Sequence, residues 1–557
     1  MDDRLDSWKD IAAYLGREVR TVQGWEKNEG LPVHRHQHAR QGSVYAFKLE
    51  LDSWRKKRAS QPEALPDQPE APEKATRTTG PRRLFATLGA TVVLAVGFGW
   101  YLWKTRAAAP APPTSVVVLP FVDMSPAKDQ EYFSDGLTEE IIDALSRVPR
   151  LHVVARTSAF AYKGKANDIR KIAEQLNVDS VLEGSVRKSG NALRITAQLN
   201  RATDGFHLWS RTYDRPLGDI FAVQTEISRE IAKQLRTGDV TPREPTSDLE
   251  AYRLYLEGRF FFNQFSPEGF EKAIERYQDA IALDPKFALA YAALADAYSY
   301  KAEFGIAAPR QVMPKAKEAA SQAVSLDPSS GEAHTALGLV KLDFDWDRRG
   351  ARQEFQRAAE LNPSSSWVHH WLGHLAEAEG RLGDAIAEMR SAMKLDPLSM
   401  PLYWDLGWDL TLAKDYPEAV KVLDSAIELF PPNPATLITR LRLAFRMGDQ
   451  ESIQRKLPQL ASFPDNPMTL AYVNAIQHRK REATEALQRL EQLREKEYVD
   501  AMGGLDTCLT LGDQGCAALW LKRAYEERST IFVYAPLYFG DQLSLATGAA
   551  ALLAAIR

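Results

Sequence analysis

Basic and polar side chains gather in the first 60 residues, at spacings that suit contacts with a nucleic acid. Arg and Lys neutralise phosphates, whereas Thr and Gln form hydrogen bonds with base edges or phosphate oxygens. Residues 1–106 hold 18 Lys and Arg against 13 Asp and Glu, a net charge of +5, although the 557-residue chain has a net charge of −4. The residues predicted to contact DNA are Arg17, Arg20, Thr21, Gln23, Lys27, His34, Arg35, His36 and Arg40.

Two short helices joined by a glycine turn are predicted to position these side chains. Ser7 suits an N-cap, and Asp10 stands where a capping box places an acidic residue. The apolar positions that follow fall on one helical face, and Gly16 then ends the helix. A second helix over residues 19–27 would bury Val22 and turn its polar side chains outward. Two helices in this order form a helix-turn-helix, whose second helix enters the major groove of DNA.

A wing and a third helix complete the predicted head. Residues 34–42 are polar and basic, residues 43–47 are strand-like, and residues 48–57 suit a helix. The segment SWKDIAAYLGREVRTVQGWEKNEGLPVHRH resembles the MerR- or excisionase-like winged helix-turn-helix at the front of many bacterial membrane-tethered proteins. The resemblance implies that residues 1–60 bind DNA. Members of this family often carry a long basic residue where this chain has Gly24, so we expect the second helix to lack one phosphate contact.

An uncharged run of twenty residues, 84–103, follows a proline-rich linker at residues 61–83. At about 1.5 Å per helical residue, such a run spans about 30 Å, the thickness of the hydrocarbon core of a bilayer. Four Lys and Arg residues lie within residues 74–83 and two within residues 104–106, which favours a cytoplasmic amino terminus. We therefore expect a single-pass protein of the bacterial inner membrane, with its carboxyl terminus in the periplasm.

Residues 114–240 alternate between strand and helix signals. Strands are predicted at 115–121, 151–155, 180–187, 192–199 and 206–213, and helices at 135–145, 168–176 and 219–235. The strings VVVLPFVDMS, EYFSDGLTEEIIDALS and VDSVLEGSVRKSGNALRITAQL resemble the TolB-like amino-terminal, or FlgO-like, family. The resemblance implies a small α/β domain without known catalysis. Several members of that family also carry nucleotide cyclase domains, for which this chain has no motif.

A repeat begins near residue 248. Two alanines seven residues apart, followed five residues later by proline, recur five times, and the prolines are 43, 35, 34 and 34 residues apart. A period of 34 indicates tetratricopeptide repeats, two helices per unit, over residues 248–434, with degenerate helical repeats over 435–557. The long first step predicts a longer loop near residues 303–313. Such arrays form a concave groove, and we expect a protein or peptide partner to bind there.

Other constellations that could do chemistry are weak. Asp135 and Glu139 stand at the start of a predicted helix, where acidic residues stabilise the N-terminus, so no catalytic carboxylate pair is expected. His34, His36 and His38 alternate, but no Cys or carboxylate completes a metal site, and a wing that faces phosphates explains them better. We expect no catalytic residues, no metal, no cofactor and no enzyme activity.

The only two cysteines, Cys508 and Cys516, leave two alternatives open. In an oxidising compartment they could form a disulfide. Two buried free thiols are equally compatible with the sequence, which does not decide between them.

These features predict a multidomain, mainly α-helical chain with a tetratricopeptide α-solenoid, an α/β TolB-like domain, an N-terminal winged helix-turn-helix and one transmembrane helix. The layout is similar to that of ToxR/CadC-type regulators, so the predicted function is a membrane-tethered one-component transcriptional regulator. A ligand or partner bound to the repeats would change how the chain associates into a homodimer. The two heads of the homodimer would then bind two DNA half-sites. The alternative is an envelope scaffold or assembly protein that acts through its repeats and has no DNA role.

Overall fold

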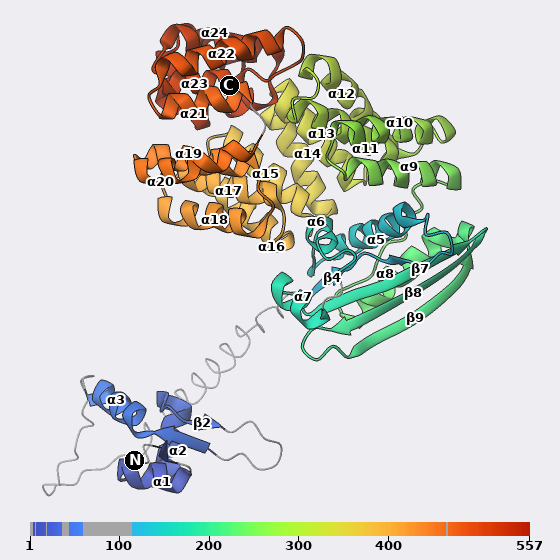
Figure 1. The fold of residues 1–557 in the computed structure, drawn as a ribbon. Coiled ribbons are helices and arrows are strands. Elements are labelled where there is room, and N and C mark those ends of the chain that lie inside the picture. The colour runs from blue at the N-terminus through green and yellow to red at the C-terminus, as the bar shows by residue number, and fades with distance from the viewer. Residues whose placement is uncertain are drawn as a thin grey trace, which may run out of the picture. The chain divides into compact units, whose positions relative to one another are not determined.

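The computed structural model describes residues 4–5, 7–17, 19–35, 44–59, 114–165, 168–463 and 466–556. The chain divides into two compact units, residues 1–107 and residues 108–557, and each is considered by itself. The first unit is the head, which contains the described residues up to 59. The second contains an α/β domain and the helical repeats (Figure 1).

The head contains the predicted helix-turn-helix elements and a small sheet. Ser7 caps the first helix, since its Oγ accepts a hydrogen bond from the Asp10 backbone N–H at 3.2 Å, and Gly16 ends it at φ 63°. A left-handed residue of this kind favours glycine. The strands lie in the order β1-β3-β2, and Ile11, Val22 and Leu51 form the fully buried centre. The elements are β1 (Arg4–Leu5), α1 (Trp8–Leu15), α2 (Val19–Glu29), β2 (His34–Arg35), β3 (Val44–Phe47) and α3 (Lys48–Ala59).

The α/β domain has a mixed sheet in the order β6-β4-β7-β8-β9, with β5 paired to β7. Strand β4 is parallel to β6 and β7, whereas β7, β8 and β9 form an antiparallel meander. Its strands are β4 (Thr114–Val118), β5 (Val122–Asp123), β6 (Leu151–Val153), β7 (Ser180–Ser189), β8 (Ala192–Arg201) and β9 (His207–Pro216). Its helices are α5 (Glu131–Ser146), α6 (Arg156–Phe160), α7 (Ile169–Leu176) and α8 (Ile220–Gln234). Every strand and helix predicted between residues 115 and 235 is present.

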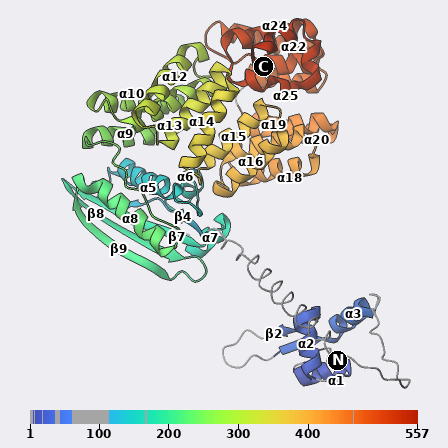
Figure 2. The ribbon, with the colours of Figure 1, turned by 180° about the vertical axis from the view of Figure 1, so that it is seen from behind.

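The repeats are antiparallel helix pairs that stack from α9 onward (Figures 1 and 2). The first six pairs are α9 (Leu249–Phe262) with α10 (Pro267–Leu283), α11 (Ala288–Glu303) with α12 (Pro309–Leu326), α13 (Gly331–Val340) with α14 (Arg348–Leu361), α15 (Ser366–Ala378) with α16 (Leu382–Leu395), α17 (Met400–Leu412) with α18 (Tyr416–Leu429), and α19 (Pro434–Met447) with α20 (Gln450–Lys456). Later helices are α21 (Pro467–Ile476), α22 (Lys480–Arg494), α23 (Met502–Thr510), α24 (Gln514–Glu527), α25 (Ala535–Phe539) and α26 (Ala549–Leu553).

Small residues recur in the first helix of successive repeats because the second helix packs directly on them. A Cβ atom at Gly338 would lie 2.5 Å from the Phe355 ring, and one at Gly407 would lie 2.5 Å from Leu423. Both distances are far inside van der Waals contact, so a larger residue at either position would force the neighbouring side chain to move. The recurrence of a small residue at this position is therefore explained by packing.

The longer loop predicted near residues 303–313 is wrong. Helix α11 extends to Glu303 and α12 begins at Pro309, so only five residues connect them. The extra residues lengthen these two helices to 16 and 18 residues, against 13 and 14 in α15 and α16. Helix α12 contains Pro314 in its second turn, where the proline removes the hydrogen bond that a backbone N–H would donate to the Arg310 carbonyl.

The predicted fold class and location are corrected on one point, the membrane span. Among the described residues, none of the helices combines the length and the apolar character that crossing a bilayer requires. Even the 18-residue α12 carries Arg310, Lys315, Lys317 and Glu318, whose charges a hydrocarbon core excludes. The uncharged run 84–103 and the linker 61–83 lie outside the described residues. A single-pass inner-membrane protein therefore has no support in this structure.

The alternative left open for the cysteines is decided in favour of a disulfide. Cys508 in α23 and Cys516 near the start of α24 are bonded, with 5.6 Å between their Cα atoms. The bond links the two helices of one degenerate repeat across their short connection.

Candidate nucleic-acid interface and repeat groove

Helix α2 presents a polar face in the head. Arg20 and Lys27 are exposed and Gln23 is half-buried, whereas Val22 is fully buried. Residues spaced three, four and seven apart share one side of a helix, so these three polar residues lie together and Val22 lies opposite. Trp25 packs on the core side, with its ring 5.6 Å from that of Trp54. The structure thus brings together three of the predicted contact residues.

Two further predicted contact residues flank this face. Thr21 is exposed beside Arg20, and Arg17 is exposed in the turn that precedes α2. Gly24 falls in the middle of the face, where a Cβ atom would meet no heavy atom within 4 Å. The centre of the face therefore has open space where a longer side chain would fit.

The predicted wing residues are placed only in part. His34 is half-buried, stacks on Tyr45 at 5.2 Å and lies 2.7 Å from a carboxylate oxygen of Glu50. These contacts tie β2 to α3 inside the head. Arg35 pairs with Val44 in the sheet. The Arg35 side chain, His36, His38 and Arg40 are outside the described part of the head.

The α/β domain contacts the repeats through a buried ion pair. Glu139 of α5 is 3% exposed and lies 2.5 Å from both Arg156 and Arg259. Burial alone would raise the pKa of Glu139, but the charges of Arg259 and Arg156 outweigh burial and lower it. Its neighbour Asp135 pairs with Lys163 at 2.6 Å. These two acids are therefore neutralised separately by basic partners, which is not the arrangement of a catalytic pair.

A second contact joins the domain to a turn between repeats. The backbone N–H and Oγ of Ser158 donate to Asp396 Oδ1 at 3.0 and 2.5 Å, and the Leu398 N–H donates to Ser158 Oγ at 2.8 Å. A cavity of about 280 Å³ lies between α5 and the first helices of the repeats, lined among others by Asp143, Asp296 and Trp367. The domain thus covers one part of the inner face of the array.

The carboxyl-terminal region covers another part of that face (Figure 2). Segment 530–539, which contains the turn η4 (Thr530–Tyr534) and α25, packs on α11 and α15. The Tyr534 hydroxyl donates to Asp343 Oδ1 at 2.7 Å, and the Tyr538 hydroxyl donates to Glu377 Oε2 at 3.2 Å. The groove predicted to receive a partner is therefore filled here by the chain itself.

Acidic side chains line the inner face beneath this segment. Burial raises the pKa of Asp343 to about 7 and that of Glu377 to about 8, and it raises the pKa of Glu303 well above its usual value. Asp409 is fully buried, and within the described residues neither of its carboxylate oxygens has a hydrogen-bond partner. Carboxyl groups therefore cluster in the interior of the array, and burial favours their protonated forms.

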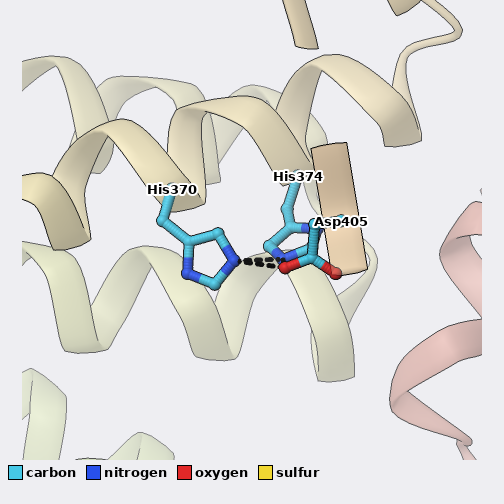
Figure 3. A group of neighbouring side chains, drawn as sticks. All are labelled: His370, His374 and Asp405. Atoms are coloured by element: carbon cyan, nitrogen blue, oxygen red, sulfur yellow. Dashed lines mark hydrogen bonds and ion pairs between the residues drawn. The ribbon is translucent and has the colours of Figure 1, made fainter. Parts of the chain in front are cut away.

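One group among the described residues could hold a metal ion. His370, His374 and Asp405 place one ligand atom each within 4.8 Å of the others (Figure 3). These three residues were not among the predicted site residues. The four-residue spacing of the histidines was readable, but Asp405 comes from the next repeat and meets them only after the helices stack.

Two family models match the chain, one in the α/β domain and one in the repeats. A model of the HilA/YgeH-like transcriptional regulator, second domain, matches residues 113–228, and a tetratricopeptide repeat model matches residues 372–434. The TolB-like assignment of residues 114–240 stays a prediction, because the matching model describes a different family.

Two curated relatives match parts of the chain. "Putative adenylate cyclase 3" of Rhizobium meliloti (strain 1021) is 41% identical over 248 residues, which cover 43% of this chain and 41% of that protein. "Transcriptional regulator HilA" of Salmonella typhimurium is 24% identical over 295 residues, 52% of each chain. The chain spans about half the length of these relatives or less, and the prediction that it is not an enzyme stays a prediction.

Solved structures also match parts of the chain. PilW, a widely conserved type IV pilus biogenesis factor, is 21% identical, with 39% of this chain and 94% of that chain covered at a TM-score of 0.33. YrrB, a TPR protein with an unusual peptide-binding site, is 22% identical, with 33% and 90% covered at a TM-score of 0.24. The chain thus carries a HilA/YgeH-like regulator domain and tetratricopeptide repeats, a combination that fits a transcriptional regulator with a protein-interaction domain.

Proposed function

We propose that this chain regulates transcription by binding DNA through its head and a protein or peptide partner through its repeats. The exposed polar face of α2, with Arg20 and Lys27 on either side of Gln23, is the observation that carries the proposal. Exposed cations on a helix preceded by a short turn suit the approach to a negatively charged major groove. The HilA/YgeH-like domain in the same chain supports a regulatory role.

The contact residues divide into two groups by position, the first on helix α2 and the turn before it. Arg17, Arg20 and Lys27 would neutralise phosphates, whereas Thr21 and Gln23 would reach base edges or phosphate oxygens. The second group is the wing: His34, Arg35, His36 and Arg40 would contact the backbone beside the groove. Because a single head offers few phosphate contacts, it would bind weakly, and pairing of two chains on two half-sites would provide the necessary affinity.

Partner binding would be coupled to the segment that fills the groove. Residues 530–539 occupy the inner face at α11 and α15, so a partner that binds there must displace them. Asp343 and Glu377 accept hydrogen bonds from the tyrosine hydroxyls of this segment, so a partner that displaces it would need to supply hydrogen-bond donors in their place.

The first experiment is genome-wide DNA crosslinking of the intact chain, which supplies the operator, followed by binding measurements on that operator at several salt concentrations. Arg20→Gln should weaken binding about tenfold and reduce the slope of log K against log salt by about 0.9, the value of one phosphate contact. Lys522→Gln is the matched control, since it removes the same charge from an exposed site in α24.

The scaffold alternative makes the opposite prediction. If the repeats alone carry the function, no DNA sites are enriched by crosslinking, and Arg20→Gln leaves every interaction of the chain unchanged. That result would contradict the regulator proposal.

A further inference from the structure

Two histidines and an aspartate converge inside the repeat array. His370 and His374 lie one turn apart on α15, and Asp405 faces them from α17 (Figure 3). His370 Nε2 is 2.7 Å from Asp405 Oδ2 and 3.1 Å from His374 Nε2, and His374 Nε2 is 3.8 Å from Asp405 Oδ2. Three ligand atoms therefore surround one point.

Hydrogen bonds alone do not satisfy these three atoms. A neutral imidazole has one N–H and one lone pair. Two N–H groups facing each other at 3.1 Å would repel, so at most one of the two Nε2 atoms of the neutral rings carries a proton. One proton then serves three mutual contacts, and the remaining lone pairs face one another. A cation at the shared point would relieve that repulsion.

The separations also suit a metal ion. Imidazole nitrogen and carboxylate oxygen bind Zn²⁺ at about 2.0–2.2 Å in tetrahedral geometry, which places the ligand atoms roughly 3.3 Å apart. The observed separations of 2.7, 3.1 and 3.8 Å bracket that value. Two imidazoles with one carboxylate suit transition metals, whereas Mg²⁺ and Ca²⁺ require oxygen ligands.

A second layer of side chains holds the ligands in place. His374 Nδ1 lies 2.8 Å from Glu377 Oε2, which in turn accepts a hydrogen bond from the Tyr538 hydroxyl at 3.2 Å. A carboxylate on the far nitrogen of a ligand histidine fixes its ring and its tautomer in metal sites. His370 is 7% exposed, whereas the side chains of His374 and Asp405 are 15% and 26% exposed, so the site is partly open to solvent.

We propose that His370, His374 and Asp405 bind a divalent transition-metal ion of the Zn²⁺ class, with a fourth position left for water or a partner's side chain. The ion joins α15 to α17, the first helices of two successive repeats. It also lies beside segment 530–539, since the Tyr534 ring is 5.7 Å from that of His374. The site is independent of the DNA-binding proposal.

The test uses the full chain without an affinity tag, in its oxidised form, freed of metal with a chelator and titrated with Co²⁺ and Zn²⁺. We expect one Co²⁺ per chain with the absorption of a tetrahedral ion, its displacement by Zn²⁺, and a rise in Tm on Zn²⁺ addition. His374→Gln and Asp405→Asn should weaken binding by at least the tenfold to hundredfold that loss of an outer partner costs. Glu377→Gln should weaken it by about tenfold.

The matched control is His369→Gln. His369 is the neighbour of His370 on the same helix but pairs with Glu388 at 2.7 Å and lies outside the cluster, so its loss should leave binding unchanged. Circular dichroism confirms that each variant is folded. Failure of the folded wild-type chain to bind Co²⁺ would overturn the proposal, as would unchanged binding in both His374→Gln and Asp405→Asn, which would place the metal elsewhere.

Discussion

The head and the repeat array use charged side chains in opposite ways. On α2 of the head, Arg20 and Lys27 are exposed to water, where a charge costs little. In the second unit, Glu139 is 3% exposed and held between two guanidinium groups that come from different elements. Removing a charge from water is costly, and each buried partner offsets that cost only while the geometry holds.

This difference separates binding from stability. Substitutions of exposed charges in the head should change affinity for a polyanion and leave the free energy of unfolding nearly unchanged. Substitutions of buried charges in the array should unfold it or loosen the docked α/β domain. A substitution that breaks this rule would show that the two regions are less distinct than their burial suggests.

The largest effect is expected at Arg259. Replacement by Met leaves Glu139 buried with Arg156 as its one cationic partner among these contacts, beside the hydrogen bond from Asn263, and breaking a buried pair in this way costs about 3–5 kcal/mol. Arg253→Met, one turn and a half earlier on α9, removes a half-exposed Arg that pairs with Glu250, and should cost about 0–1 kcal/mol. Urea unfolding of both full-length variants measures the difference. Equal losses would mean that burial does not decide the cost.

The second effect concerns Asp396, where the α/β domain meets a repeat turn. Burial raises its pKa to about 6 despite the hydrogen bonds from Ser158. The pKa of Asp396 in the folded chain lies above its value of about 3.9 in the unfolded chain. Its contribution to the free energy of unfolding is therefore fully present below pH 4 and is lost as the pH rises through 6. The shift is worth about 3 kcal/mol. The asparagine side chain of Asp396→Asn does not titrate. The free energy of unfolding of the wild type should therefore fall by about 3 kcal/mol more than that of Asp396→Asn when the pH rises from 4 to 8.

A pH-independent difference between wild type and Asp396→Asn would contradict this account. Asparagine keeps the oxygen that accepts from the Ser158 N–H, so the comparison isolates the charge. Unfolding curves at both pH values, at equal ionic strength, provide the measurement.

Local order could be predicted from the sequence because its causes are local. The Ser7 cap and the Gly16 stop each act within a few turns of helix, so the helices of the head lie close to their predicted bounds, and the 34-residue spacing of the prolines indicated the helix pairs of the repeats. The hairpin between β7 and β8 follows from the turn at Gly190, which has φ 58°.

Docking could not be predicted because its partners are far apart in the chain. Ser158 and Asp396 are separated by 238 residues, and Tyr534 and Asp343 by 191. No periodicity links such positions. The filled groove and the His370 cluster both depend on how the repeats stack, so the sequence yielded an empty groove and no metal site. Length and hydropathy at residues 84–103 likewise indicated a span that the described helices do not supply.

The third effect lies in the degenerate repeats, where the interior is held by a covalent bond as well as by packing. The disulfide between Cys508 and Cys516 closes a loop of sequence separation 8. Closing so short a loop stabilises by about 2–3 kcal/mol through the unfolded chain. Reduction, or Cys508→Ser with Cys516→Ser, should lower the urea midpoint of the array and leave DNA binding by the head unchanged. A loss of DNA binding would show that stability and binding are coupled.

The smallest effect compares one substitution in both regions. Gly24→Ala in α2 meets open space, and alanine favours a helix by about 1 kcal/mol over glycine, so the head should become more stable. Gly338→Ala puts a methyl group 2.5 Å from the buried Phe355 ring, and overpacking should cost about 1–3 kcal/mol. Thermal unfolding of each variant gives the two signs.

The position of Gly24 also connects stability to recognition. Because this residue sits between Arg20 and Lys27 on the same face, Gly24→Arg should add a phosphate contact as well as helix propensity, and steepen the salt slope by about 0.9. Gly24→Ala provides the control, since it adds the helix propensity without the charge. If both variants bind DNA with equal affinity, any increase over the wild type comes from helix propensity alone, and the side chain at position 24 does not contact a phosphate. If only Gly24→Arg binds more tightly, the open centre of the face is where the phosphate lies.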